Sequence, residues 1–168
     1  MRSLLALAAL SLPQLAGAQE IDQPHTGGRP VTLDLHAGFA WYGNGLALGG
    51  RIGIPIVDNG FVKTINNSVY INFGADFYYA EYYNGNNFEE RSAALGIPVS
   101  MQWNFYFTPE WSAYGEVGVN LYVHNGDFRP GPYWGIGAVG GRYHFSESAA
   151  LMLRLGSPYS SFGFELSF

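Results

Sequence analysis

Hydrophobic and polar residues alternate with a period of two along most of the chain. Between Val31 and Tyr42 the odd positions are apolar, while the even positions include Thr32, Asp34 and His36. Side chains of a β-strand point alternately to its two faces, whereas an amphipathic helix repeats every three to four residues. The pattern therefore predicts β-strands and no helical stripe.

Seven further runs of this kind follow, separated by short turn signals such as Gly43-Asn44-Gly45, which carries the Asn-Gly pair of a tight hairpin. In the sixth run Ile136 falls on the opposite parity to Val139, which predicts a glycine-associated bulge near Gly140-Gly141. The eight predicted strands are Val31–Tyr42, Leu48–Ile56, Val69–Tyr79, Leu95–Phe107, Trp111–His124, Tyr133–Phe145, Leu151–Leu155 and Ser161–Phe168.

The two faces of these strands differ in side-chain volume. One face is crowded with Trp, Phe, Leu and Ile, and the other is rich in Gly, Ser, Asn and Tyr. The interior of an eight-stranded barrel is just wide enough to be filled by side chains, so the apolar faces would overfill it. We therefore expect an all-β fold, an eight-stranded antiparallel up-and-down transmembrane barrel with its apolar faces in lipid and a polar, filled lumen.

Nearly all mid-strand charges share the polar face. Facing lipid, an Arg at mid-bilayer would cost roughly 2–4 kcal/mol, so we expect these charges to form a paired network in the lumen. Centring the last turn between Tyr159 and Ser160 predicts that Arg154 lies directly opposite Glu165. The predicted network comprises Asp34, His36, Arg51, Asp76, Glu116, Arg142, Arg154 and Glu165.

Aromatic residues gather where the predicted strands end. This is the arrangement of the two aromatic belts that mark membrane interfaces. One predicted belt contains Phe105, Phe107, Trp111, Tyr143, Phe145 and Phe168, and the other contains Trp41, Phe77, Tyr79, Tyr133, Tyr159 and Phe162.

Composition narrows the function classes. Of 168 residues, 48% are hydrophobic but only 12% are charged, about half the charged share of a soluble domain. The net charge is -5 and Lys63 is the single lysine, which excludes a nucleic-acid-binding surface. The chain has no cysteine and its four histidines lack ligand spacing, so we expect no metal site and no cofactor.

The first residues are typical of a secretory signal. Arg2 precedes an apolar run, and Ala16-Gly17-Ala18 is a small-residue cleavage site. We expect residues 1–18 to be a cleavable signal peptide, 19–30 a polar periplasmic lead-in and 31–168 the barrel domain.

The chain ends in alternating apolar positions, Phe164, Leu166 and Phe168. This ending resembles the C-terminal signature of bacterial outer-membrane barrels, which the barrel assembly machinery reads. With the predicted signal and eight strands, residues 31–168 resemble small outer-membrane barrels of the OmpX, OmpA-barrel and OmpW kind. The resemblance implies the bacterial outer membrane as location and outer-membrane lipid and lipopolysaccharide as neighbours.

An even strand number predicts that both ends of the barrel domain lie on the periplasmic side. The expected extracellular loops are Gly43–Gly45, Tyr82–Ser92, His124–Pro132 and Gly156–Ser160, and the expected periplasmic turns are Asp58–Asn67, Thr108–Glu110 and Ser146–Ser148. The first of these turns is unusually long for the class. Pro55 and Pro98 interrupt predicted strands, where they mark bulges, strand ends or a kink that opens the wall.

Three functions follow from these features. The leading hypothesis is a non-enzymatic outer-membrane barrel with a plugged lumen, whose extracellular loops contact a surface ligand in a structural or adhesion-like role. A second is an OmpW-like conduit for small hydrophobic molecules. A third is lipid A deacylation, because His144-Phe145-Ser146 resembles the His-x-Ser pair of PagL-type enzymes, with Glu147 or Glu165 to orient the base. The predicted position of His144 at the periplasmic rim argues against the third.

Overall fold

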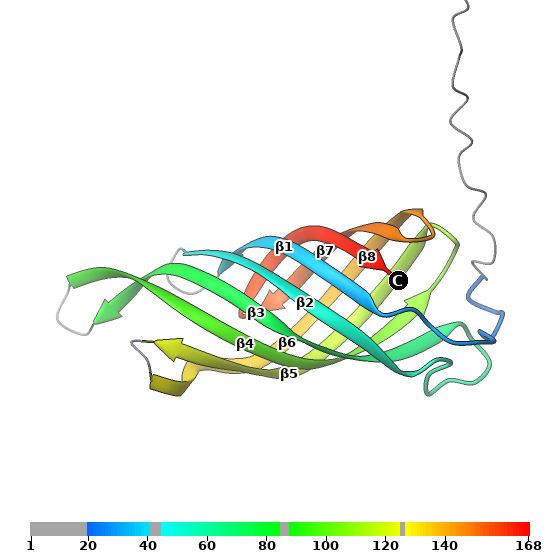
Figure 1. The fold of residues 1–168 in the computed structure, drawn as a ribbon, viewed down its shortest axis with the longest axis horizontal. Helices are drawn as coiled ribbons and strands as arrows, with labels where there is room; N and C mark the ends of the chain where they lie inside the picture. Colours follow the sequence, from blue (N-terminus) through cyan, green and yellow to red (C-terminus); the bar gives the residue numbers. More distant parts are fainter. Residues whose placement is uncertain (1–19, 41–44, 85–87, 125–126) are drawn as a thin grey trace, which may run out of the picture.

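The computed structural model describes residues 20–40, 45–84, 88–124 and 127–168, and side chains within these ranges except at 40, 80–92 and 124–134. Eight antiparallel strands follow one another in chain order, and the first pairs with the last, so the sheet closes into a barrel (Figure 1). The strands are β1 Thr32–Ala40, β2 Gly45–Val57, β3 Asn67–Asn84, β4 Phe88–Tyr106, β5 Trp111–His124, β6 Asp127–Ser146, β7 Ala149–Ser157 and β8 Tyr159–Ser167. The predicted eight-stranded up-and-down barrel is confirmed.

The strands of the barrel alternate between inward and outward side chains, as their sequence pattern requires. On β5, Tyr114 and Glu116 are 3% exposed, whereas Val117 between successive inward positions is 58% exposed. Small residues let the wall close around its contents. A Cβ at Gly140 would lie 2.2 Å from the ring of Tyr114, so the inward position opposite this tyrosine requires glycine.

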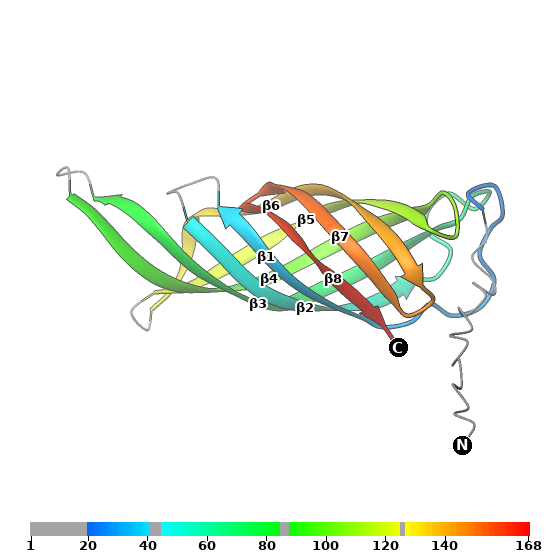
Figure 2. The same cartoon turned by 90° about the horizontal axis from the view of Figure 1, so that it is seen from above.

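The two ends of the barrel differ. One end holds the C-terminus, the lead-in residues 20–31 and the turns 58–66, 107–110 and 147–148, and we call it the turn end (Figure 2). At the opposite end, the pairing of β3 with β2 stops at Tyr79 of β3, and the pairing of β4 with β5 stops at Leu95 of β4. The pairing of β3 with β4 continues to Asn84 and Phe88. The β3–β4 hairpin therefore projects beyond the barrel (Figure 1).

Three predicted loops are wrong in extent. Most of Tyr82–Ser92 belongs to β3 and β4, most of His124–Pro132 belongs to β5 and β6, and all of Gly156–Ser160 except Pro158 belongs to β7 and β8. Their polar sequences lack clean alternation, but backbone pairing along a hairpin does not need an apolar face. Residues 41–44, 85–87 and 125–126 at the hairpin tips, like the predicted signal 1–18, lie outside the described residues.

The predicted bulge near Gly140-Gly141 is also wrong. The pairing of β6 with β5 runs without interruption from Gly135 to Tyr143, and Ile136 faces the interior at 5% exposure. The irregularity lies instead between Pro130 and Gly135, where the register with β5 shifts by several residues. The opposite parity of Ile136 reflects an apolar side chain on the inner face of a continuous strand.

The two strand prolines have different settings. Pro55 stands at a register shift between β2 and β3, so it marks a bulge. Pro98 is fully buried on the inner face of β4 and pairs with Asn120 of β5. On its other side, β3 pairs with β4 at Phe73–Val99 and, in the same register, again from Asp76–Gly96.

Candidate functional site

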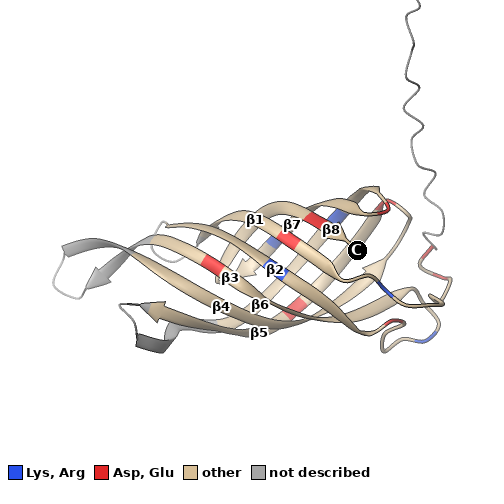
Figure 3. Ribbon diagram, in the orientation of Figure 1, with Lys and Arg blue, Asp and Glu red and all other residues tan. Residues whose placement is uncertain are grey.

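The candidate site is the interior of the barrel, where charged side chains from several strands meet. All eight residues of the predicted lumen network point inward. Figure 3 shows where the charged Arg, Asp and Glu residues lie along the strands of the barrel. The structure brings them together in two groups, which we call the central cluster and the lower cluster.

Glu116 of β5 holds the central cluster together. Its Oε1 accepts a hydrogen bond from Arg51 Nη1 at 2.7 Å, and its Oε2 accepts one from Arg154 Nε at 2.9 Å. Ser100 Oγ donates to Oε1 at 2.7 Å. One carboxylate thus bridges two guanidinium groups, and all three side chains are almost completely buried. Buried charges are tolerated only when they are paired in this way.

Tyr159 of β8 is the second junction of the central cluster. Its hydroxyl lies 2.6 Å from Arg51 Nη2, 2.6 Å from His36 Nε2 and 2.7 Å from Asp76 Oδ2. Its ring also lies 4.9 Å from the guanidinium carbon of Arg154. Tyr159 is 0% exposed, so its hydroxyl depends on other protein groups for hydrogen bonds.

The hydrogen-bond donors of this junction can be assigned by counting. Arg51 can only donate and an ionised Asp76 can only accept, so the Tyr159 hydroxyl gives its hydrogen to Asp76. His36 Nε2 must then donate to Tyr159, while its Nδ1 lies 2.8 Å from Asp34 Oδ1. The imidazole of His36 thus lies between the carboxylates of Asp34 and Asp76.

The lower cluster lies nearer the turn end and centres on Arg142 of β6. Arg142 Nε donates to Glu165 Oε2 at 2.8 Å, Nη1 to Asn104 Oδ1 at 2.7 Å and Nη2 to Gln102 Oε1 at 2.6 Å. Its guanidinium carbon lies 4.3 Å from the ring centre of Tyr114. The cation is therefore bonded along its edges and stacked on one face.

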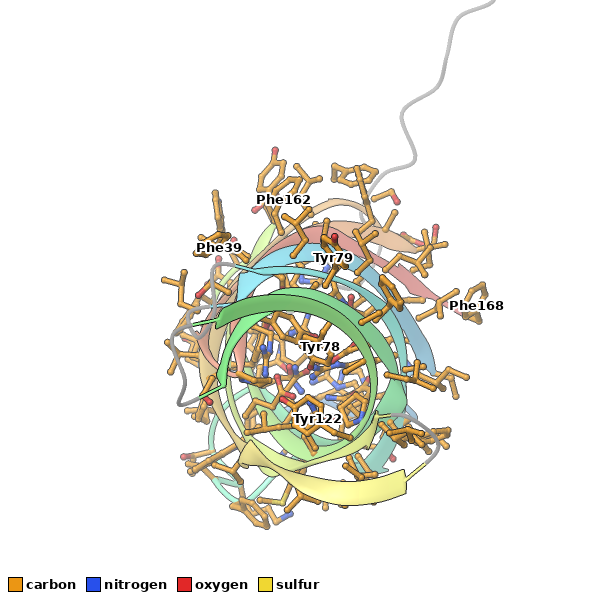
Figure 4. The ribbon with its side chains drawn as sticks, turned by 90° about the vertical axis from the view of Figure 1, so that its left-hand side faces the viewer. Phe39, Tyr78, Tyr79, Tyr122, Phe162 and Phe168 are labelled. Atoms are coloured by element: carbon orange, nitrogen blue, oxygen red, sulfur yellow. The ribbon has the colours of Figure 1, made fainter. Side chains whose placement is uncertain are left out.

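A layer of tyrosines covers the central cluster on the side of the projecting hairpins. Tyr78 contacts the rings of Tyr122 and Tyr159, with centroids 5.3 and 5.8 Å apart. Ala47 and Ala94 complete this small apolar group. Figure 4 looks into the barrel from this end and shows Tyr78 and Tyr122 inside the ring of strands. Side chains thus fill the middle of the interior.

A cavity of about 290 Å³ lies at the turn end, and Arg142 and Glu165 form part of its lining. The lead-in forms part of its lining through His25, Arg29 and Pro30. Arg29 fastens the lead-in, because its Nε donates to Asp58 O at 3.1 Å, its Nη2 donates to Asn66 Oδ1, and its guanidinium stacks on Tyr106. Burial, together with the Arg29 charge, lowers the pKa of His25.

The predicted His144–Ser146 pair does not form a hydrogen-bonded dyad in the described structure. His144 Nε2 lies 2.8 Å from Ser112 Oγ, on the neighbouring strand β5. Ser146 lines the turn-end cavity with Glu147. This arrangement pairs two partly buried polar side chains of β5 and β6.

The predicted belt residues with described side chains point outward, with one exception. Phe77, Tyr79 and Phe162 are about half exposed toward the end opposite the turn end. Near the turn end, Trp111 packs against Tyr143 with ring centroids 5.0 Å apart. At the turn end Phe105 is half-buried, while Phe107, Phe145 and Phe168 are exposed. In the predicted C-terminal signal, Phe164 of β8 is exposed as well. Leu166 is 37% exposed. Trp41 lies outside the described residues, as does the Tyr133 side chain.

Tyr159 is the exception, and its assignment to a belt is wrong. It shares the inward parity of Ser161 and Glu165, and its hydroxyl binds charges that only the interior supplies. Sequence position near a strand end suggested an interface, but parity along β8 decides the direction.

The predicted pairing of Arg154 with Glu165 is also wrong. Arg154 lies opposite Ser161 in the β7–β8 ladder, and Ala150 lies opposite Glu165. The turn is centred near Ser157-Pro158, two residues before the predicted centre, so the register moves by four residues. Arg154 instead pairs across the barrel with Glu116, and Glu165 pairs with Arg142.

Sequence reasoning missed several neutral partners of the charges. Tyr78, Ser100, Gln102 and Asn104 bond directly to charged side chains of the clusters, and Asn120 donates to the Tyr78 hydroxyl. Their inward parity was visible, but only the structure shows which strands face each other across the interior.

Among the described residues, no group of three or more His, Asp or Glu side chains is placed to hold a metal ion. None of the described segments is a helix long and apolar enough to cross a membrane. Comparison of the sequence with protein-family models finds no match, and comparison with curated proteins finds none either.

Proposed function

We propose that the chain is a small bacterial outer-membrane β-barrel protein with an outward-facing apolar wall in lipid. The observation that carries this proposal is the inverted polarity of the barrel. Arg51, Glu116 and Arg154 are at most 3% exposed inside, whereas Val117, Val139 and Phe164 are 58%, 63% and 52% exposed outside. In water such a wall would be a large apolar patch without a partner.

The closed sheet supports the same proposal. A bilayer offers no hydrogen bonds to a backbone, so only helices and closed barrels span it. Here the pairing of β1 with β8 leaves no open edge along the barrel wall. Exposed aromatic residues near both ends, such as Tyr79 and Trp111, suit the two interfaces of a membrane.

We assign the protein a non-enzymatic role that depends on the end from which the β3–β4 hairpin projects. The two clusters and the tyrosine layer fill the middle of the interior, which argues for a plugged lumen. The β3–β4 hairpin extends past β2 and β5, so its backbone edges can pair with a surface ligand. Outer-membrane lipid and lipopolysaccharide would surround the wall, and Phe164, Leu166 and Phe168 would present the signal for the barrel assembly machinery.

Cell fractionation tests this proposal. Full-length protein produced in a Gram-negative host should be recovered in the outer-membrane fraction, and the unboiled protein should migrate differently from the boiled protein on a denaturing gel. Recovery in the soluble periplasmic fraction would overturn the proposal.

One observation favours a conduit for small hydrophobic molecules as a second candidate. The pairing of β3 with β4 is interrupted between Phe73–Val99 and Asp76–Gly96, beside Pro98, which removes a backbone donor from the ladder. A conduit predicts robust conductance in planar bilayers or swelling of liposomes, whereas a plugged lumen predicts neither. Steady conductance would therefore replace the plugged-lumen assignment while leaving the membrane location intact.

A further inference from the structure

The long turn between β2 and β3, residues 58–66, lies at the turn end of the barrel (Figure 1). Asn67 and Val69 have the outward parity of β3, yet both are 0% exposed, whereas Phe73 and Phe77 on the same face are 40% and 48% exposed. Trp103, the β4 partner of Val69, packs edge-on against Phe61 of the turn with ring centroids 5.3 Å apart. The turn therefore covers the outer wall near the turn end.

Asn67 organises this turn. Its Nδ2 donates to the carbonyls of Val62 and Ile65 at 2.6 and 2.8 Å, and its Oδ1 accepts a hydrogen bond from Trp103 Nε1 at 2.9 Å. A Cβ at position 60 would lie 2.2 Å from Asn67 Oδ1, so this close approach requires Gly60. The turn is thus a built structure that satisfies a polar side chain on the outward face.

The covering turn presents apolar side chains of its own. Phe61 is 59% exposed and Val62 is 38% exposed, and Lys63 beside them is exposed as well. Lys63 Nζ donates to the Asn59 carbonyl at 2.8 Å, which uses one of its three donors. The carboxylate of Asp58 is bonded to the backbone of Arg29 instead. Two apolar groups and one ammonium group therefore share the outer surface of the turn.

We propose that Phe61, Val62 and Lys63 form a foot that binds phospholipid at the membrane interface of the turn end. The inference rests on the proposed membrane location of the barrel. The foot is continuous with the outer wall, because Trp103 under Phe61 also packs on Phe105 at 4.7 Å. Irregular backbone is excluded from the hydrocarbon core, which places the foot at the level of the headgroups.

The side chains of the foot contact different parts of the lipid. Phe61 and Val62 enter the boundary between acyl chains and headgroups, where aromatic and aliphatic groups leave water. Lys63 has a long apolar stem and a charged end, so it reaches anionic lipid phosphates from the same depth. This assignment accounts for a turn much longer than the other two at its end, residues 107–110 and 147–148.

Spin labelling tests the foot directly, because the chain has no cysteine of its own. Single variants F61C, V62C, V117C and S148C are each labelled with a nitroxide in vesicles of phosphatidylethanolamine and phosphatidylglycerol. Collision rates are measured with oxygen, which concentrates in lipid, and with a water-soluble nickel chelate. V117C reports the middle of the outer wall, and S148C reports an exposed polar turn at the same end.

The foot predicts an oxygen-to-nickel ratio at F61C and V62C that is well above the ratio at S148C and below the ratio at V117C, as an interfacial depth requires. A ratio at both foot positions equal to that at S148C, with V117C still shielded from nickel, overturns the foot and leaves the barrel in the membrane. Nickel access at V117C contradicts the proposed function itself. Because Phe61 and Val62 are exposed, loss of either side chain should leave the barrel folded, and an unchanged heat-dependent gel shift checks this.

Discussion

At the scale of single residues, the interior is held by two junctions that each serve several strands. Glu116 bridges Arg51 and Arg154, and the Tyr159 hydroxyl joins β8 to β1, β2 and β3. The four inward-facing carboxylates exceed the three guanidiniums by one, and His36 lies between two of these carboxylates, those of Asp34 and Asp76. Removal of either junction should therefore cost more than an ordinary surface contact.

Replacement of Glu116 by Ala leaves Arg51 and Arg154 without the carboxylate between them. Breaking a buried ion pair from one side costs about 3–5 kcal/mol, and we expect a loss of that size in the free energy of unfolding. Urea titration of the protein in lipid vesicles, followed by tryptophan fluorescence, measures it. The exposed variant E20A serves as control and should change stability little; an equal, small effect at both positions would contradict the bridging role.

Tyr159→Phe removes one hydroxyl and keeps the ring. Arg51, His36 and Asp76 then lose a shared partner inside the barrel, and unsatisfied buried groups cost about 1–3 kcal/mol. The same change at Tyr79, which points outward and is 46% exposed, should have almost no effect. The two variants are compared by the same urea titration, and equal stabilities would show that Tyr159 is not a junction.

At the scale of elements, alternation in the sequence predicts the strands and their faces but not their partners. The inward direction of Arg154 and Glu165 follows from parity alone, whereas their pairing depends on the centre of the β7–β8 turn, which sequence signals misplace by two residues. The sequence pattern does not predict the hairpin ends, such as Tyr82–Asn84, because apolar and polar residues do not alternate there. Tyr159 escapes prediction because its bonding partners come from other strands.

Cross-linking tests the β7–β8 register. Leu153 lies opposite Phe162 in the ladder and both point outward, so L153C/F162C should form a disulfide, since Cα atoms of opposite residues lie about 4.5–5.5 Å apart. The pair L155C/F164C would face each other if the turn were centred between Tyr159 and Ser160. In the observed register these positions are four residues out of step, roughly 13 Å along the strand, so no cross-link should form. Mass spectrometry of the oxidised protein distinguishes the two, and the opposite result would contradict the register.

At the scale of the whole molecule, the central claim is that the barrel has its polar side chains inside and its apolar wall in lipid. A cysteine scan along β5 from Ser112 to Leu121 tests this claim most directly, with a nitroxide at each position in vesicles and oxygen and nickel collision rates as the measurement. We expect oxygen access to oscillate with a period of two, with maxima at outward positions such as Val117 and Val119 and shielding from nickel throughout. Nickel access at the outward positions, or no oscillation, would contradict a lipid-facing wall.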